Sequence, residues 1–209
     1  QAEKTTNSLI HTLSQKEKSE ILSIPLDYPF MKNEEKLALI ERFKQHAGVK
    51  EILLSDVGYM QGMSGNGLTT EKGNENSWID ISVMAVPANF FSFMNIPIEE
   101  GRLPQTEKDI VVDNVWQEMQ KKNVIGMNLY SGNTDYTICG ISAPFQANVY
   151  NRSSGYAFLP YDPSVYIGHC YIKSHPDQQK EVARWIEKVY REMLPENITY
   201  QAKTFLDDI

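Results

Sequence analysis

The sequence has 209 residues, of which 41% are hydrophobic and 22% are charged; this composition is typical of a folded globular protein and excludes a disordered chain. Its formal net charge of −7 argues against a nucleic-acid partner, because binding a polyanion requires a clustered basic face. No apolar run approaches the roughly 20 residues that a membrane-spanning helix needs. The sequence starts at Gln1 without a signal peptide, so we expect a soluble domain excised from a longer protein.

Residues 1–57 predict a βαβ unit behind a short leader. The expected elements are a weakly amphipathic leader helix over 1–18 with Leu9, Ile10 and Leu13 on one face, a strand over 21–26, a helix over 33–47 and a strand over 50–57. Asn33 is a good helix cap, the acidic pair at 34–35 suits a positive first turn, and Gly48 commonly follows a helix end. Two strands joined by such a helix form one βαβ unit.

A glycine-rich stretch follows the second predicted strand. Residues 62–67 read Gly-Met-Ser-Gly-Asn-Gly, which suggests a phosphate-binding loop. However, the glycine spacing does not fit GxGxxG, no Gly-Lys-Ser/Thr follows, and residues 68–77 have the composition of a loop instead of a helix that holds an anion at its N-terminus. We therefore expect an exposed loop over 59–77 without nucleotide-binding chemistry.

Residues 78–141 alternate strand-like and helix-like segments. The expected elements are a strand over 78–86, a short helix over 88–95, a strand over 109–113, a small helix after Asn114, and extended runs from Val124 and over 136–141. The first strand alternates apolar and polar residues, as a strand with one buried face does. Three phenylalanines and a methionine between 90 and 94 make this segment too apolar for a loop, so we expect a short helix there. Asn114 is expected to cap the second helix.

Residues 169–203 predict a second βαβ unit. A strand over 169–173 is followed by Ser174-His175-Pro176-Asp177, which resembles a capping box with proline in the first helical turn. The helix behind it carries one apolar stripe and stops at Pro195. The stripe consists of Val182, Trp185, Ile186, Val189 and Met193. A strand over 198–203 closes the unit.

Two βαβ units that flank an insertion predict an α+β fold. We expect a split ferredoxin-like sheet with both helices on one face, built from residues 1–58 and 167–209. Residues 59–166 then form an inserted, smaller mixed α/β subdomain, whose segment at 145–155 is the most irregular part of the chain. If both chain ends lie at the same end of one sheet, both can continue into membrane helices.

The order of short motifs in the middle of the chain resembles that of a known family. Val86-Pro87-Ala88-Asn89-Phe90-Phe91 is followed by Asn95-Ile96-Pro97-Ile98-Glu99-Glu100-Gly101-Arg102, by the 109–113 strand, by Ile125-Gly126-Met127 and by the 136–141 run. Their order and spacing over roughly a third of the chain are more specific than any one of them. The sequence resembles the extracytoplasmic domains of MacB-like and FtsX-like ABC transporter permeases.

This resemblance implies a noncatalytic domain that moves with membrane helices lying outside this sequence. A separate cytoplasmic ATP-binding subunit or domain drives those helices, and the transporter is dimeric. The domain is periplasmic and anchored to the inner membrane. Both chain ends build a porter-like, membrane-proximal subdomain, and the insertion is a distal subdomain that meets a periplasmic partner protein or the exported substrate.

Residue types that carry catalysis or bind metals are scattered through the sequence. The histidines are His11, His46, His169 and His175. None has the i, i+4 or HExxH spacing of a metal site, and Gly-x-Ser-x-Gly is absent. His169 and Cys170 point to opposite faces of one strand because successive side chains alternate. We therefore predict no catalytic, cofactor-binding or metal-binding residues and no enzyme activity.

Cys139 and Cys170 both fall in strand-like runs. We expect two small buried side chains, and a disulfide stays open as the alternative in an oxidising cell envelope. Neither belongs to a CxxC pair, so they do not indicate a metal site.

Two other functions stay open from the residues alone. A freestanding binding or adhesion module of the cell envelope would share the fold and the absence of catalytic motifs, and tyrosines in the insertion would then supply a partner-binding patch. These tyrosines are Tyr130, Tyr136, Tyr150, Tyr156, Tyr161 and Tyr166. An enzyme would need a cleft that gathers titratable groups with strongly perturbed pKa values.

Overall fold

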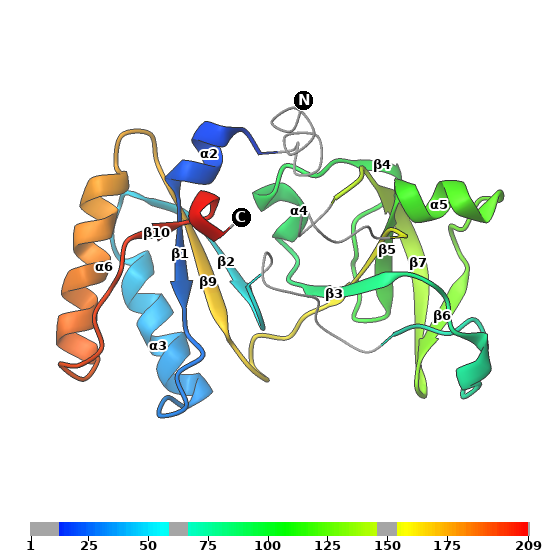
Figure 1. Cartoon of the computed structure of the whole chain (residues 1–209), viewed down its shortest axis with the longest axis horizontal. Helices are drawn as coiled ribbons and strands as arrows, with labels where there is room; N and C mark the ends of the chain where they lie inside the picture. The colour runs from blue at the N-terminus through cyan, green and yellow to red at the C-terminus, as the bar shows by residue number, and fades with distance from the viewer. Residues whose placement is uncertain (1–12, 59–66, 146–153, 209) are drawn as a thin grey trace. The chain divides into compact units, whose positions relative to one another are not determined.

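The computed structural model describes residues 13–58, 67–145 and 154–208. These residues form two units, whose helices and strands are labelled in Figure 1. The ferredoxin-like unit comprises residues 14–58 and 162–208, and the inserted unit comprises residues 67–145 and 154–161 together with Leu13. No helix in these described ranges is both long enough and apolar enough to cross a membrane.

The ferredoxin-like unit is built on one antiparallel sheet with strand order β10-β1-β9-β2. Its elements are α2 (Gln15–Glu20), β1 (Ile21–Pro25), α3 (Asn33–Lys44), β2 (Val49–Ser55), β9 (His169–Ser174), α6 (Gln179–Met193), β10 (Lys203–Thr204) and the short 3₁₀ helix η2 (Leu206–Asp208). This is the strand order of a split pair of βαβ units. The prediction of an α+β fold with a split ferredoxin-like sheet is confirmed.

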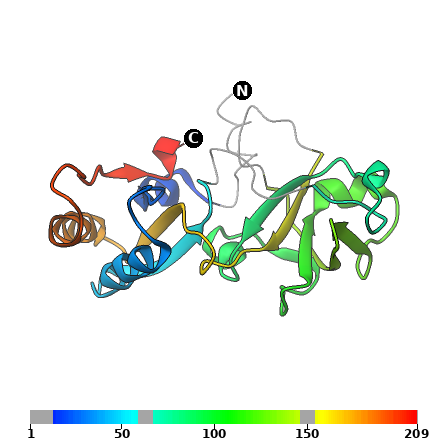
Figure 2. The ribbon, with the colours of Figure 1, turned by 90° about the horizontal axis from the view of Figure 1, so that it is seen from below.

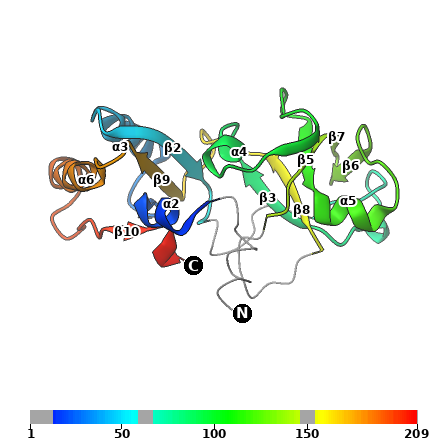
Figure 3. The ribbon, with the colours of Figure 1, turned by 90° about the horizontal axis from the view of Figure 1, so that it is seen from above.

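Helices α3 and α6 cover one face of this sheet (Figure 3). The shared core takes alternate residues of the strands and one stripe of each helix. It includes Leu22, Ile24, Cys170 and Ile172 from the strands, Leu39, Ile40 and Phe43 from α3, and Val182, Ile186, Val189 and Tyr190 from α6. Full burial of one large aliphatic side chain contributes about 1.5–3 kcal/mol. The predicted stripe of α6 is therefore largely right, although Met193 at its end is 41% exposed.

The opposite face of the sheet is covered by α2 and by the chain after β10 (Figure 2). Helix α2 begins with a capping box, because the Ser14 hydroxyl accepts the Glu17 N–H and the Glu17 carboxylate accepts the Ser14 N–H. Phe205 is fully buried, with its ring centroid 5.3 Å from that of Tyr171 in β9. Of the predicted leader helix, Leu9 and Ile10 lie outside the described residues.

Neither predicted helix cap of this unit forms. Helix α3 starts at Asn33 with Lys32 in the cap position, because the Asn33 side chain bonds instead to the segment at 163–167. Helix α6 starts at Gln179 without a side-chain cap. The positive φ of 64° at Asp177 turns the chain first, so Ser174 is too early to cap the helix.

The closing strand is also shorter than predicted. Strand β10 covers only Lys203–Thr204 instead of residues 198–203. Ile198 and Tyr200 pack against the helix-covered core, and the Tyr200 ring centroid lies 5.5 Å from that of Tyr190. Burial of these apolar side chains beside α6 replaces pairing with β1.

The inserted unit is a mixed sheet with strand order β3-β8-β5-β7-β4, and β6 pairs with β7. Its elements are the 3₁₀ helix η1 (Glu75–Ser77), β3 (Ser82–Val86), α4 (Phe90–Phe93), β4 (Ile98–Gly101), β5 (Asp109–Asp113), α5 (Asn114–Gln120), β6 (Asn128–Ser131), β7 (Thr134–Ser142) and β8 (Tyr156–Pro160). The pairs β3–β8 and β5–β7 are parallel, and the others are antiparallel. The inserted mixed α/β subdomain is thus confirmed in kind.

Both faces of this sheet carry buried side chains, and every residue of the central strand β5 is buried. One face packs aliphatic residues against Trp116 of α5. The other face carries an aromatic cluster, which consists of Phe90, Phe91, Phe145, Tyr156 and Phe158. The predicted apolar helix after Pro87 is α4, and its phenylalanines supply part of this cluster.

Two predictions in the inserted unit are wrong in detail. The strand expected over 78–86 begins only at Ser82, because Trp78 bridges Thr69 instead of joining the sheet. The cap of α5 is Asp113 and not Asn114, since the Asp113 carboxylate accepts the Trp116 N–H at 3.0 Å. Gly155, with φ of 104°, makes room for that carboxylate, because an added Cβ would lie 2.5 Å from its Oδ1.

Candidate functional site

In the ferredoxin-like unit, the first and last described segments meet on the face of the sheet opposite α3 and α6 (Figure 1). Helix α2 contacts both β10 and η2. Strand β10 pairs with β1 at Ser23 opposite Lys203, and the Phe205 N–H donates to the Ile21 carbonyl at 2.8 Å. We name α2, β10 and η2 the terminal junction. Both described ends therefore contact β1, the strand between β10 and β9.

A buried polar network fastens the terminal junction to the sheet. The Ser23 hydroxyl lies 2.7 Å from Nε2 of His169 and donates to the Asp208 carboxylate at 2.5 Å. Ser23 and His169 are buried. Since the single hydroxyl proton of Ser23 goes to Asp208, Nε2 of His169 donates to the Ser23 oxygen. The network joins β1, β9 and η2, although Ser23 and Asp208 are far apart in the sequence.

These three residue types do not form a catalytic triad here. In a triad the acid orients the histidine and the histidine deprotonates the serine, but Asp208 bonds directly to Ser23 and Nε2 of His169 is a donor. Burial lowers the pKa of His169 to about 4 and raises the pKa of Asp208. We interpret the network as a structural fastening of the last described residues.

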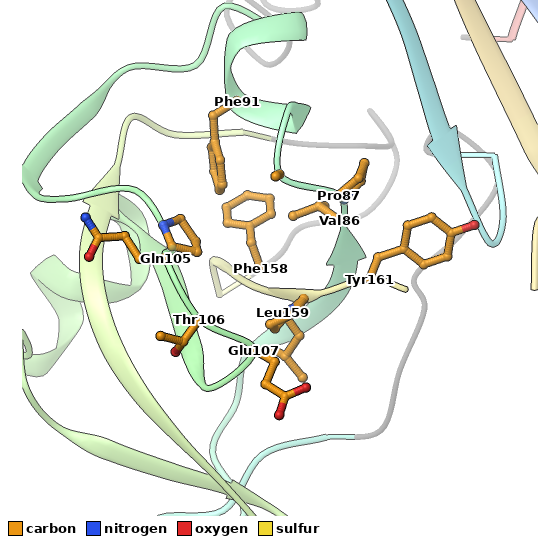
Figure 4. Close-up of a pocket in the computed structure, with 12 residues that line it drawn as sticks. Val86, Pro87, Phe91, Gln105, Thr106, Glu107, Phe158, Leu159 and Tyr161 are labelled. Carbon is orange, nitrogen blue, oxygen red and sulfur yellow. The ribbon is translucent and has the colours of Figure 1, made fainter. Parts of the chain in front are cut away.

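The inserted unit contains a groove of about 260 Å³ beside α4 (Figure 4). Its walls come from the end of β3, from α4, from the loop before β5 and from the end of β8. The lining residues are Val86, Pro87, Ala88, Phe91, Pro104, Gln105, Thr106, Glu107, Phe158, Leu159, Pro160 and Tyr161. Prolines and aromatic rings dominate its surface, and Glu107 is the only carboxylate among them. The groove suits an apolar group and does not pair an acid with a base.

Asp109 holds the loop that forms one wall of the groove. Its carboxylate accepts from the Arg102 guanidinium at 2.7 Å, the Gln105 N–H at 2.9 Å and the Thr106 N–H at 3.1 Å. These donors lower the pKa of Asp109 to about 2, and the hydrogen bond from Arg102 has the largest effect. The loop is therefore held by an ionised acceptor over the whole physiological pH range.

Replacing Asp109 by alanine is expected to destabilise the inserted unit by about 2 kcal/mol, because it leaves two backbone donors and a guanidinium without their acceptor. Urea unfolding measures the change. Asp109→Asn is the matched control, since it keeps a neutral acceptor oxygen and should lose less. Equal losses in the two variants would show that a neutral acceptor oxygen cannot replace the carboxylate, and no loss in either variant would contradict the role assigned to Asp109.

The described histidines make different contacts: the backbone N–H of His175 donates to the Gly48 carbonyl at 2.8 Å, and His169 belongs to the buried polar network. Nδ1 of His46 accepts the Gly48 N–H at 2.9 Å, His175 is exposed before α6, and His11 lies outside the described residues. Within the described part of the chain, no group of three or more His, Cys, Asp or Glu side chains is placed to hold a metal ion.

Cys139 and Cys170 are both free and buried, as expected for small packed side chains. They belong to different units, in β7 and β9. Burial raises the pKa of both thiols, so little reactive thiolate forms at neutral pH. As predicted, Cys170 and His169 face opposite sides of the sheet, because Cys170 lies in the helix-covered core.

The remaining candidates that the structure describes do not assemble into a site. Residues 62–66 and Tyr150 lie outside the described residues. Residues 68–77 form a turn and the single turn η1, which is too short to bind a phosphate at its N-terminus. The described tyrosines are divided between the units: Tyr156 is buried in the aromatic cluster, whereas Tyr166 lies in the ferredoxin-like unit and is 44% exposed.

Comparison with known proteins identifies the fold. No family model and no curated protein sequence matches the chain, but several solved structures do. The periplasmic region of MacB from Actinobacillus actinomycetemcomitans matches with a TM-score of 0.58 and 12% identity over 88% of this chain and 91% of that one. The extracellular domain of the noncanonic ABC-type transporter YknZ from Gram-positive bacteria gives 0.55 and 13% over 88% and 96%.

A third structure, a domain of a putative permease protein from Porphyromonas gingivalis, matches with a TM-score of 0.55 and 12% identity over 74% of this chain and 69% of that one. All three are domains of transporters or permeases. At such low identity the likeness concerns the fold. The chain has the fold of the MacB-type extracytoplasmic domain, as its sequence motifs predict.

Proposed function

We propose that this chain is a noncatalytic extracytoplasmic domain of an ABC transporter permease. The observation that supports this most directly is the terminal junction, where α2 and η2 contact each other on one face of the ferredoxin-like sheet. A domain looped out between two membrane helices needs its first and last segments side by side. The shared fold with domains of MacB and YknZ supports the same function.

In the proposed mechanism, a separate cytoplasmic ATP-binding subunit or domain moves membrane helices that continue from the terminal junction. The ferredoxin-like unit is the membrane-proximal subdomain of a dimeric transporter anchored to the inner membrane. The inserted unit is distal and faces a periplasmic partner or the exported substrate. Its apolar groove, with Phe91 and Phe158 in its wall, is the surface we assign to that contact.

The proposed lack of catalysis is supported by the chemistry of both candidate sites. In the polar network the Ser23 hydroxyl donates its proton to a hydrogen bond with Asp208. The groove has a single carboxylate among its lining residues. Neither provides a nucleophile next to a free base.

The topology can be tested by placing the full-length protein, in its native reading frame, in its own cell envelope. Single cysteines replace Lys180 on α6 or Glu118 on α5, which are both exposed, and spheroplasts are treated with a membrane-impermeant maleimide. We expect labelling without lysis, recovery in the membrane fraction and co-purification of an ATP-binding protein. Labelling only after lysis would contradict the proposal, and recovery in the soluble envelope fraction would favour a freestanding module.

A further inference from the structure

The chain re-enters the ferredoxin-like unit through residues 162–168, which we name the return segment. It precedes β9 and contains no helix or strand. A segment of this kind is usually mobile on the surface, and Val165 at its centre is 77% exposed. Nevertheless, both of its ends are held by side chains from the first turn of α3.

Asn33 binds the return segment at two points. Its Nδ2 donates to the Pro163 carbonyl at 2.7 Å, and its Oδ1 accepts the Ile167 N–H at 2.9 Å. The amide thus uses both its donor and its acceptor on backbone groups of one segment. This explains why Asn33 is the first residue of α3 and leaves the helix without a side-chain cap.

Lys36, one turn along the same helix, binds the same segment. Its side chain is only 2% exposed, its Nζ donates to the Ile167 carbonyl at 2.6 Å, and Nζ lies 4.4 Å from the ring centroid of Tyr166. Burial lowers the pKa of Lys36, and the charge of Asp27 opposes this effect. Burying an ammonium group costs free energy unless the group is paired with acceptors. The Ile167 carbonyl and the Tyr166 ring therefore stabilise Lys36 in this position.

The same segment is tied to the start of the outgoing connection. The Gly168 N–H donates to the Ser55 carbonyl at the end of β2, and the Gly168 carbonyl accepts the Leu26 N–H, both at 2.9 Å. An added Cβ at Gly168 would lie 1.9 Å from the Asp56 carbonyl oxygen. The chain leaving this unit and the chain returning to it are therefore in backbone contact here.

We propose that Asn33 and Lys36, the α3 clamp, lock the return segment to α3 so that the inserted unit follows the movements of the ferredoxin-like unit. The inference rests on the proposed function, because it names the positioning residues that transmit motion from the terminal junction. Without the clamp, the segment keeps the buried Ile167 side chain and the backbone bonds of Gly168, but residues 163–166 lose their side-chain contacts with α3 and gain freedom to move. The stiffness of the connection then depends on two side chains of one helical turn.

The test compares the wild-type chain with the double variant Asn33→Ala/Lys36→Met. Spin labels at positions 180 and 118 report the distance distribution between the units by pulsed electron paramagnetic resonance, and hydrogen exchange reports the Ile167 amide. We expect a broader distance distribution and roughly tenfold faster exchange of that amide, because its acceptor and the bond to its carbonyl are lost. Lys44→Met, at a solvent-exposed position of the same helix, should change neither.

Asn33→Asp is a milder second variant, because it keeps the acceptor for the Ile167 N–H and loses only the donor to Pro163. If the double variant does not fold, Asn33→Asp should still broaden the distribution. A lower melting temperature with an unchanged distance distribution would overturn the proposal and leave the clamp a purely structural feature. The test uses the chain alone, so its failure is distinct from a failure of the membrane-topology experiment.

Discussion

Replacing Phe158 by alanine is expected to destabilise the inserted unit by about 3–5 kcal/mol, the range for removing a buried phenylalanine. Phe158 is 1% exposed and lies at the centre of the aromatic cluster. Its ring centroid is 5.4 Å from Phe90, 5.2 Å from Phe91 and 6.2 Å from Phe145. The substitution removes several ring contacts at once and opens a cavity next to the groove.

Hydrogen exchange measured at increasing urea concentrations separates the two units, because peptides from each report its own opening. We expect the Phe158→Ala variant to lose protection in β5, β7 and β8, while β1 and β9 keep theirs. Phe30→Ala is the matched control, since Phe30 is 49% exposed and its removal should cost little. Loss of protection in both units to the same extent would mean that they unfold as one cooperative body.

Helix α6, strand β5 and the order of the two βαβ patterns were predictable from sequence because their signals are local. The apolar stripe that includes Val182, Ile186 and Val189 has helical spacing, and these residues form the buried face of α6. Strand β5 coincides with the predicted run over 109–113, since a short aliphatic run between polar turns leaves few alternatives. Two such βαβ patterns around an insertion were enough to predict the split ferredoxin-like sheet.

The failed cap at Asn33 and the missed polar network both depend on contacts between distant parts of the chain. Asn33 has the chemistry of a helix cap, yet it binds Pro163 and Ile167, which lie far along the sequence. The polar network was missed for the same reason, because nothing local to Ser23 or Asp208 indicates that they meet. A serine in an otherwise apolar strand was the one available signal, and alone it does not identify a partner.

Mild acid is expected to destabilise the ferredoxin-like unit through His169. Its pKa of about 4 in the folded chain lies below the ordinary value of about 6.5, so the unfolded chain binds the proton more tightly. The contribution of neutral His169 to the free energy of unfolding is therefore complete above pH 6.5, and it is lost as the pH falls towards 4. Between pH 7 and pH 5 the loss is about 2 kcal/mol. The raised pKa of Asp208 acts in the opposite direction and offsets part of it.

The inserted unit is expected to respond with the opposite sign. Burial raises the pKa of Asp113, the cap of α5, to about 6, so the folded chain binds this proton more tightly and gains about 1 kcal/mol between pH 7 and pH 5. Exchange protection of β9 should fall over this range while that of β5 rises. The His169→Asn variant should show a weaker pH dependence of exchange protection in β9. The His175→Asn variant, changed at an exposed position, should keep the pH dependence of the wild type. A parallel fall in both units would contradict the opposite burial effects on these two side chains.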